Sequence, residues 1–198
     1  MDGRSLVAVP LLPAPAAATR RLFRVLRDDA VELARAARGN ATLKSVAATV
    51  VANDAFAILA LCRLRALARR FHVIGVNHLL RRIQTVIYGI EIGNEVTLGR
   101  GVYFIHPIGV VVGGNAQIGD RVRFLGSNTV GTACDNGYPV VEDDVVLGAG
   151  SRILGPIRVG ARSVVGANAV VVRTVPSDCV ATGIPASARP RRADKARS

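Results

Sequence analysis

The chain has 198 residues and a formal net charge of +12, because 26 lysines and arginines face 14 acidic residues. This length suffices for one sizeable domain, or two small ones, with its own hydrophobic core. The charge favours anionic partners, but aromatic residues make up only 4% and tryptophan is absent, so the stacking surfaces of single-strand nucleic-acid binders are lacking. We expect a phosphorylated small molecule as partner rather than nucleic acid, with an acidic lipid surface as the alternative.

The three cysteines, Cys62, Cys134 and Cys179, are scattered along the chain. Their spacing fits neither a disulfide framework nor a zinc site. We interpret them as ordinary core or loop residues of a protein in a reducing compartment, which predicts a cytoplasmic location and no metal.

Residues 1–19 form an apolar but proline-interrupted N-terminus, with prolines at positions 10, 13 and 15. This segment is too short and too rich in proline to span a membrane, and it lacks the basic start of a secretion signal. We expect a disordered leader and no transmembrane segment.

Residues 20–88 carry apolar residues at helical spacing and predict an α-helical domain of three or four helices. Breaks are expected at residues 39–40, 53–54 and 75–77. Residues 55–71 are apolar nearly all round in their first half, so we expect them to be buried against a neighbouring helix or a second subunit.

From residue 92 onward the period changes from 3.6 to six, because an aliphatic residue followed by glycine returns at six-residue intervals. A second small or aliphatic residue comes four positions after the first. Such units form a prism of short parallel strands, three to a coil, that buries a continuous core. A β-sandwich would instead alternate with period two, with a turn every 8–12 residues or so. The dipeptides are Ile92-Gly93, Leu98-Gly99, Val112-Gly113, Ile118-Gly119, Val130-Gly131, Leu147-Gly148, Val159-Gly160 and Val165-Gly166.

The fold class is therefore α+β: the α-helical domain over residues 20–88 is followed by a parallel β-helix over residues 89–176. Residues 177–198 are expected to form a C-terminal cap and a basic tail. The repeat is interrupted twice, by two extra residues around His106 and by five around Tyr138. We expect the chemistry at these interruptions, since there the chain departs from the regular wall.

Several motifs of the repeat region are specific. Residues 89–92 read G-I-E-I, residues 106–113 read H-P-I-G-V-V-V-G, and residues 148–157 read G-A-G-S-R-I-L-G-P-I. They are similar to the G-I-D-I and D-H-G-x-G-V-V-I-G-E signatures of the serine O-acetyltransferases. Residues 40–190 resemble that family, whose members fold as a left-handed β-helix of hexapeptide repeats.

The resemblance implies acyl transfer from acetyl-CoA, used as a co-substrate, with His106 as the general base. A neutral imidazole can take the proton of an acceptor hydroxyl as that hydroxyl attacks the thioester. Glu91 stands where the family carries the aspartate of its catalytic dyad; the alternative for Glu91 is a solvated carboxylate at the start of a strand. The family also implies a homotrimer whose sites are completed by a neighbouring subunit, and leaves open a dimer of trimers.

The acceptor side departs from the family pattern. The family binds the ammonium group of serine with two aspartates and its carboxylate with an Arg-His pair. Here those positions align with Asn40, with Ile105 directly before His106, and with the segment at Tyr138. An unpaired buried charge costs several kcal/mol, so we expect an acceptor other than free serine.

The donor side keeps small residues that would admit an extended pantetheine arm, and arginines that suit phosphate oxygens. Backbone amides near residues 126–128 are candidates for an oxyanion site. The expected CoA-binding residues are Gly131, Gly148, Ala149, Arg152, Gly166, Ala167, Arg173 and Arg189.

We therefore expect a CoA-dependent O-acetyltransferase that acts on an acceptor hydroxyl. Three alternatives remain open: a genuine serine acetyltransferase with a rebuilt pocket, an acetyltransferase of polysaccharide or natural-product hydroxyls, and an inactive trimeric scaffold. A zinc-dependent carbonic anhydrase solenoid is disfavoured, because it needs several histidines on the prism and only His106 lies there.

Overall fold

The computed structural model describes residues 15–191. The predicted helical domain contains four helices: α1 (Pro15–Arg38), α2 (Leu43–Ala52), α3 (Asp54–Arg70) and α4 (Ile74–Tyr88). The first helix begins inside the expected leader, since a proline at the first helical position has no N–H that the helix would use. The rest of that leader, and residues 192–198 of the tail, lie outside the described residues.

Local capping explains most of the helix boundaries. The side chain of Thr42 accepts a hydrogen bond from the Ser45 amide and starts α2, and that of Asn53 accepts one from the Ala55 amide and starts α3. The break predicted at residues 75–77 is wrong, because the chain turns at His72, with φ 56°, and α4 begins at Ile74. Asn77 lies within the helix, since it is buried there as a polar partner of Arg65.

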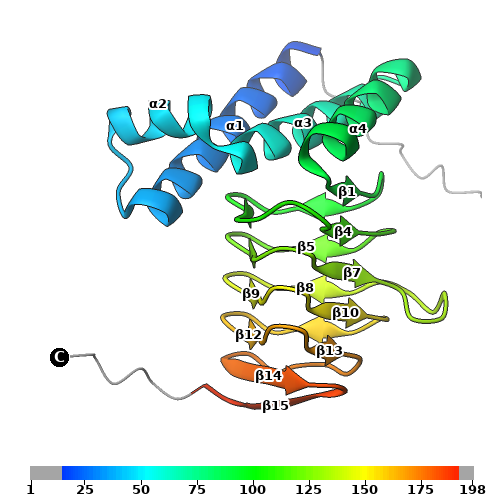
Figure 1. Ribbon diagram of the computed structural model, residues 1–198. Coiled ribbons are helices and arrows are strands. Elements are labelled where there is room, and N and C mark those ends of the chain that lie inside the picture. Colours follow the sequence, from blue (N-terminus) through cyan, green and yellow to red (C-terminus); the bar gives the residue numbers. More distant parts are fainter. Residues whose placement is uncertain (1–14, 192–198) are drawn as a thin grey trace, which may run out of the picture.

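The repeat region forms a three-walled left-handed β-helix, as predicted (Figure 1). All three sheets are parallel except for the last strand, β15. Sheet A contains β1 (Glu91–Ile92), β4 (Val111–Val112), β7 (Thr129–Gly131), β10 (Arg152–Leu154) and β13 (Val170–Val171). Sheet B contains β2 (Thr97–Leu98), β5 (Gln117–Ile118), β8 (Val140–Val141) and β11 (Arg158–Val159). Sheet C contains β3 (Tyr103–Phe104), β6 (Arg123–Phe124), β9 (Val146–Leu147), β12 (Val164–Val165), β14 (Cys179–Gly183) and β15 (Ala186–Pro190).

The interior of the prism is the predicted aliphatic core. The first residues of the repeat units are nearly all buried, for example Val112, Val130 and Val165, each fully inaccessible to solvent. Burying one such side chain contributes about 1.5–3 kcal/mol, so the stacked coils supply most of the stabilisation. Leu98, in the first coil beneath α3, is only half-buried.

The end of the solenoid lies beyond the predicted boundary at residue 176. The strand β14 still pairs in parallel with β12, with Val164 opposite Val180. After it, β15 folds back antiparallel onto β14. This hairpin covers a sheet edge that would otherwise expose unpaired backbone groups.

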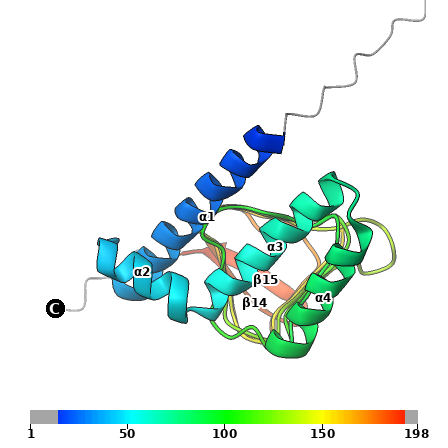
Figure 2. The ribbon, with the colours of Figure 1, turned by 90° about the horizontal axis from the view of Figure 1, so that it is seen from above.

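The helices close the other end of the solenoid. Seen from above, α3 and α4 lie across the first coil, whereas α2 projects beyond it (Figure 2). Ile58 and Leu59 of α3 join the same buried cluster as Ile90 and Ile92 of the first coil. By length and hydropathy, no individual helix between residues 15 and 191 could cross a membrane, although α2 and α3, bent by 73° at their junction, pass the same test as a pair.

Candidate active site

The two predicted interruptions lie at different corners of the prism. The corner between sheets C and A, called here the C–A corner, consists of residues 105–110, 125–128, 148–151 and 166–169. The corner between sheets A and B, called the A–B corner, includes residues 113–116, 132–139 and 155–157. His106 lies at the first corner, and Tyr138 lies at the second, in a loop that stands out from the solenoid (Figure 1).

Backbone hydrogen bonds stack the coils along the C–A corner. The amide of Ser127 donates to the carbonyl of Ile108 at 3.1 Å, that of Gly150 to Gly126 at 2.9 Å, and that of Asn168 to Ala149 at 2.8 Å. The predicted donor residues Gly148, Ala149, Gly166 and Ala167 therefore lie in one column with His106. Ala149 and Ala167 are exposed there, which gives this edge a surface of small side chains.

His106 is exposed on the two-residue insertion between β3 and β4. Gly126 of the next coil makes room for it: a Cβ at Gly126 would lie 3.0 Å from the Cβ of His106, and its φ of 118° disfavours other residues. The start of the loop is held to β6 of the next coil, because the Ile105 amide donates to the Phe124 carbonyl at 2.9 Å. Within residues 15–191, no hydrogen bond to the imidazole is found.

Glu91 lies in β1, and its amide bonds to the carbonyl of Val110 at the end of the His106 loop. Its half-exposed carboxylate forms an ion pair with Arg81 of α4. Among the described residues no hydrogen bond joins Glu91 to His106, so the dyad stays a prediction. Sequence reasoning missed Arg81, because helical periodicity alone does not reveal which strand residue a helix face meets.

The predicted acceptor residues are not all brought together within one chain. Ile105 is adjacent to His106 and 37% exposed. Asn40 lies between α1 and α2, where its side chain contacts Arg38 and Thr42. The ring of Tyr138 packs over Gly114 at the A–B corner, since a Cβ at Gly114 would lie 2.1 Å from the tyrosine Cζ. Tyr138 therefore has a packing role of its own.

The other residues that we expected to bind CoA lie at different places on the prism. Arg152, at the start of β10, donates to the carbonyl of Ser127 and stays beside the C–A corner. Arg189 lies on β15 opposite Val180 in sheet C. Gly131 ends β7 and Arg173 follows β13, so both belong to the side of the A–B corner.

Two structural details qualify the donor site. Gly148 is required by coil packing itself, because a Cβ there would lie 2.5 Å from the amide nitrogen of Ala167. The amides of Gly126 and Ser127 already donate, to Asn128 Oδ1 at 3.0 Å and to the Ile108 carbonyl. The oxyanion role of the amides near residues 126–128 therefore stays a prediction, and it would require the Gly126 and Ser127 amides to exchange these partners.

Across the described part of the chain, no group of three or more His, Cys, Asp or Glu side chains could hold a metal ion.

Comparison with known proteins agrees with this fold and repeat. The family pattern described as bacterial transferase hexapeptide (six repeats) matches residues 138–173. With its three-walled solenoid, the chain is a hexapeptide-repeat protein of the left-handed β-helix class. The structure of the soybean serine acetyltransferase apoenzyme is 31% identical in sequence and superimposes with a TM-score of 0.76, over 87% of this chain and 74% of that one. The chain belongs to the serine acetyltransferase family.

Two further relatives extend the comparison. The serine acetyltransferase of Synechococcus elongatus is 38% identical over 113 residues, which are 56% of this chain and 46% of the relative. The chain thus spans about half the length of that curated relative. A serine acetyltransferase solved in complex with CoA is 25% identical, with a TM-score of 0.76 over 88% of this chain and 73% of that one.

Proposed function

We propose that the chain is an acetyl-CoA-dependent O-acetyltransferase whose general base is His106. The observation that carries this proposal is the C–A corner, where an exposed histidine, with no side-chain hydrogen bond to any described residue, stands at one end of a column of small residues. Membership of the serine acetyltransferase family and the CoA complex of a structural neighbour support the same donor. Gly148, Ala149, Gly166 and Ala167 would line the pantetheine arm, with Arg152 at its side.

The proposed reaction is a direct transfer. The imidazole of His106 accepts the proton of the acceptor hydroxyl while the hydroxyl oxygen bonds to the acetyl carbon. The bond from that carbon to the CoA sulfur then breaks, and the proton passes from His106 to the leaving thiolate. Glu91 would stabilise the imidazolium after its half-exposed carboxylate turns from Arg81 to His106.

The proposed acceptor is an alcohol without the charged groups of free serine. Ile105 presents an apolar side chain beside His106, and Asn40 is neutral where the family has an acid. A zwitterion would leave both of its charges without an opposite partner at these positions. A serine acetyltransferase with a rebuilt pocket is the second candidate, favoured by the family membership.

The proposed assembly is a homotrimer. Tyr138, Gly131 and Arg173 lie on the side of the A–B corner, away from His106 of the same chain. A ring in which the C–A corner of one subunit faces the A–B corner of the next would bring both sets into one groove. Light scattering should give the mass of three chains, or of six if trimers pair, and a fully active monomer would contradict this assembly.

The test is thiol release from acetyl-CoA in the presence of serine, homoserine, sugars and hydroxylated peptides. We expect turnover with an acceptor other than serine, and a loss of about 100-fold or more in His106→Gln, with CoA binding retained in calorimetry. His78→Gln, at an exposed position of α4, is the matched control. Unchanged turnover in His106→Gln would disprove the mechanism, absence of turnover with every acceptor would favour a scaffold, and efficient serine acetylation would favour the second candidate.

A further inference from the structure

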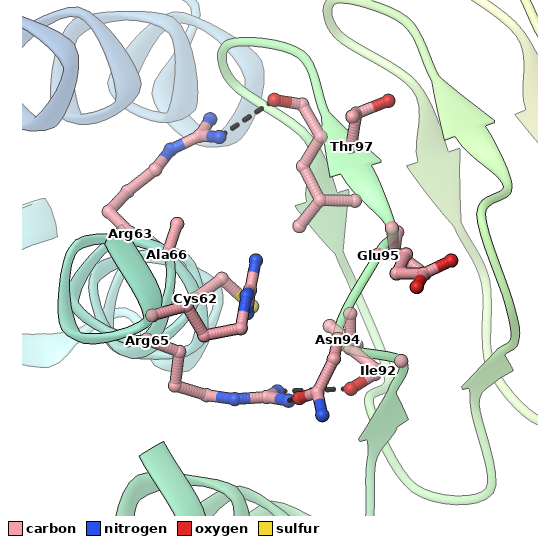
Figure 3. A pocket seen from close by; sticks show the side chains of 12 residues that line it. Cys62, Arg63, Arg65, Ala66, Ile92, Asn94, Glu95 and Thr97 are labelled. Atoms are coloured by element: carbon pink, nitrogen blue, oxygen red, sulfur yellow. Dashed lines mark hydrogen bonds between the residues drawn. The ribbon is translucent and has the colours of Figure 1, made fainter. Parts of the chain in front are cut away.

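A cavity of about 290 Å³ lies between α3 and the first coil of the β-helix (Figure 3). Five residues of α3, namely Cys62, Arg63, Arg65, Ala66 and Arg69, line one side of it, and residues 92–98 line the other. Those residues run from sheet A to sheet B, so the cavity is separate from the C–A corner that holds His106.

The charge of Arg63 is balanced within the protein. Its guanidinium forms two hydrogen bonds with the carboxylate of Asp29, at 3.1 and 3.2 Å. It also donates to the carbonyls of Leu98 and Gly99 at the rim of the first coil. Arg63 is thus a structural clamp with its own counterion.

Arg65 is buried, and none of the acidic side chains in residues 15–191 forms an ion pair with it. Only 2% of the residue is exposed, and its guanidinium donates to Gln84 Oε1 at 2.6 Å, to the Ile92 carbonyl at 3.0 Å and to Asn94 Oδ1 at 2.9 Å. These acceptors, and the more distant Asn77 Oδ1, are all uncharged. A buried cation without an opposite charge is costly.

The surroundings of Arg65 add further positive charge. Burial lowers the pKa of the Arg65 guanidinium, the neighbouring Cys62 thiol opposes this shift, and the nearby charges of Arg69 and Arg81 lower the pKa further. Arg69 is half-buried and, among the residues that the structure describes, its side chain has no hydrogen bond or ion pair. The carboxylate of Glu95, the acidic group of the lining, points away from Arg63 and Arg65 (Figure 3).

We propose that this cavity binds a small oxyanion, the carboxylate or phosphate group of a low-molecular-weight compound, between Arg69 and Arg65. The guanidinium group of Arg69 is planar and positively charged, so it can donate two parallel hydrogen bonds to a carboxylate or phosphate. The cavity falls at the lower end of the range for small-molecule sites, about 300–1,000 Å³, which suits a compound much smaller than CoA.

A bound anion would link two parts of the molecule. Arg69 belongs to α3, and residues 92–98 belong to the first coil. Binding to the native state alone stabilises that state by mass action. Occupancy would therefore fasten the helical domain to the solenoid.

The experiment titrates the full chain with sodium phosphate and, separately, with sodium succinate, at constant ionic strength kept with sodium chloride. We expect one of the two to raise the thermal unfolding midpoint by several degrees in a saturable manner, and the same anion to give a 1:1 calorimetric isotherm. The anion that acts identifies the chemical source, phosphate or carboxylate. Arg69→Gln should weaken binding about 10-fold or more, and Arg69→Lys should restore part of it.

The control is Arg82→Gln, which removes an exposed arginine of α4 outside the cavity lining. It should bind like the parent chain. Equal responses in Arg69→Gln and Arg82→Gln, or no saturable effect with either anion, would overturn the proposal. His106→Gln should keep anion binding, so failure at this cavity and failure of the proposed acetyl transfer are distinguishable.

Discussion

Single residues in this protein are constrained mainly by contacts between successive coils. Gly114 has a φ of 53° and carries the ring of Tyr138 directly above it, and Gly126 carries His106. Both contacts join residues of neighbouring coils. The glycines at these corners therefore serve packing as well as backbone conformation.

The contact between Gly114 and Tyr138 can be tested by substitution. Gly114→Ala should lower the free energy of unfolding by about 2–4 kcal/mol, from backbone strain and displacement of the ring. In a Tyr138→Ala background the same change should cost only the strain, about 1–2 kcal/mol. Gly39→Ala, with φ 73° and nothing within 4 Å, isolates that strain. Urea denaturation measures all four variants, and equal costs of Gly114→Ala in both backgrounds would show that the ring does not pack there.

The pairing of Glu91 can be tested at the same scale. If its carboxylate turns to His106 during turnover, Glu91→Gln should lower kcat/KM roughly 10-fold or more. Arg81→Gln removes the competing partner seen on α4 and should leave kcat/KM at least at the parent value, with Arg82→Gln as the control. Full activity in Glu91→Gln would assign Glu91 to the ion pair with Arg81 alone.

At the scale of elements, the helical domain and the first coil are joined by buried polar groups. Asp29 of α1 is fully buried, pairs with Arg63 of α3 and accepts a hydrogen bond from the Gly101 amide of the solenoid at 2.9 Å. Three separate segments thus meet at one carboxylate. Removing its charge leaves Arg63 without its counterion.

We predict that Asp29→Asn lowers the free energy of unfolding by about 3–5 kcal/mol, the usual cost of breaking a buried ion pair. The neighbouring Asp28→Asn, whose carboxylate contacts the largely exposed Arg27, should cost no more than about 1 kcal/mol. Chemical denaturation followed by circular dichroism compares the two. Similar losses of unfolding free energy in both variants would show that the buried ion pair of Asp29 with Arg63 contributes no more than a surface contact.

The repeat pattern predicted the elements of the solenoid better than it predicted the helices. The six-residue spacing predicts the strands well, because every unit has its inward-facing residues at the same two positions. These positions can be read from the unit itself, without knowledge of distant contacts. The break expected at residues 75–77 failed because Asn77, read as a turn residue, is buried as a partner of Arg65. A polar residue in a helix signals a loop only when no distant partner satisfies it.

Across the whole molecule, charged pairs run along the corner between sheets B and C. Asp144 pairs with Arg121 at 2.8 Å, and Asp178 with Arg162 at 2.6 Å. These hydrogen bonds hold the pKa of both aspartates below their usual range. Arg158 does the same for the pKa of Glu142.

Acid should therefore destabilise the protein. A carboxyl group whose pKa is lower in the folded state binds its proton more readily in the unfolded chain, so it stabilises the fold above its ordinary pKa. That contribution is lost as the pH falls through the lowered pKa. We expect the free energy of unfolding to decrease from about pH 5 to pH 3, and the slope to be shallower in the double variant Asp144→Asn/Asp178→Asn. An identical slope would place the acid sensitivity elsewhere.

The sequence by itself determined the solenoid, the positions of its two insertions and the family, because these depend on a repeat and on motifs read along the chain. The candidate base, His106, could be found in the same way. Only the tertiary structure decided that His106 and Tyr138 lie at different corners, that Arg81 takes the carboxylate of Glu91, and that Arg65 is buried among uncharged hydrogen-bond acceptors. Such contacts join residues far apart in the chain, and their partners are chosen by how the helices dock on the first coil.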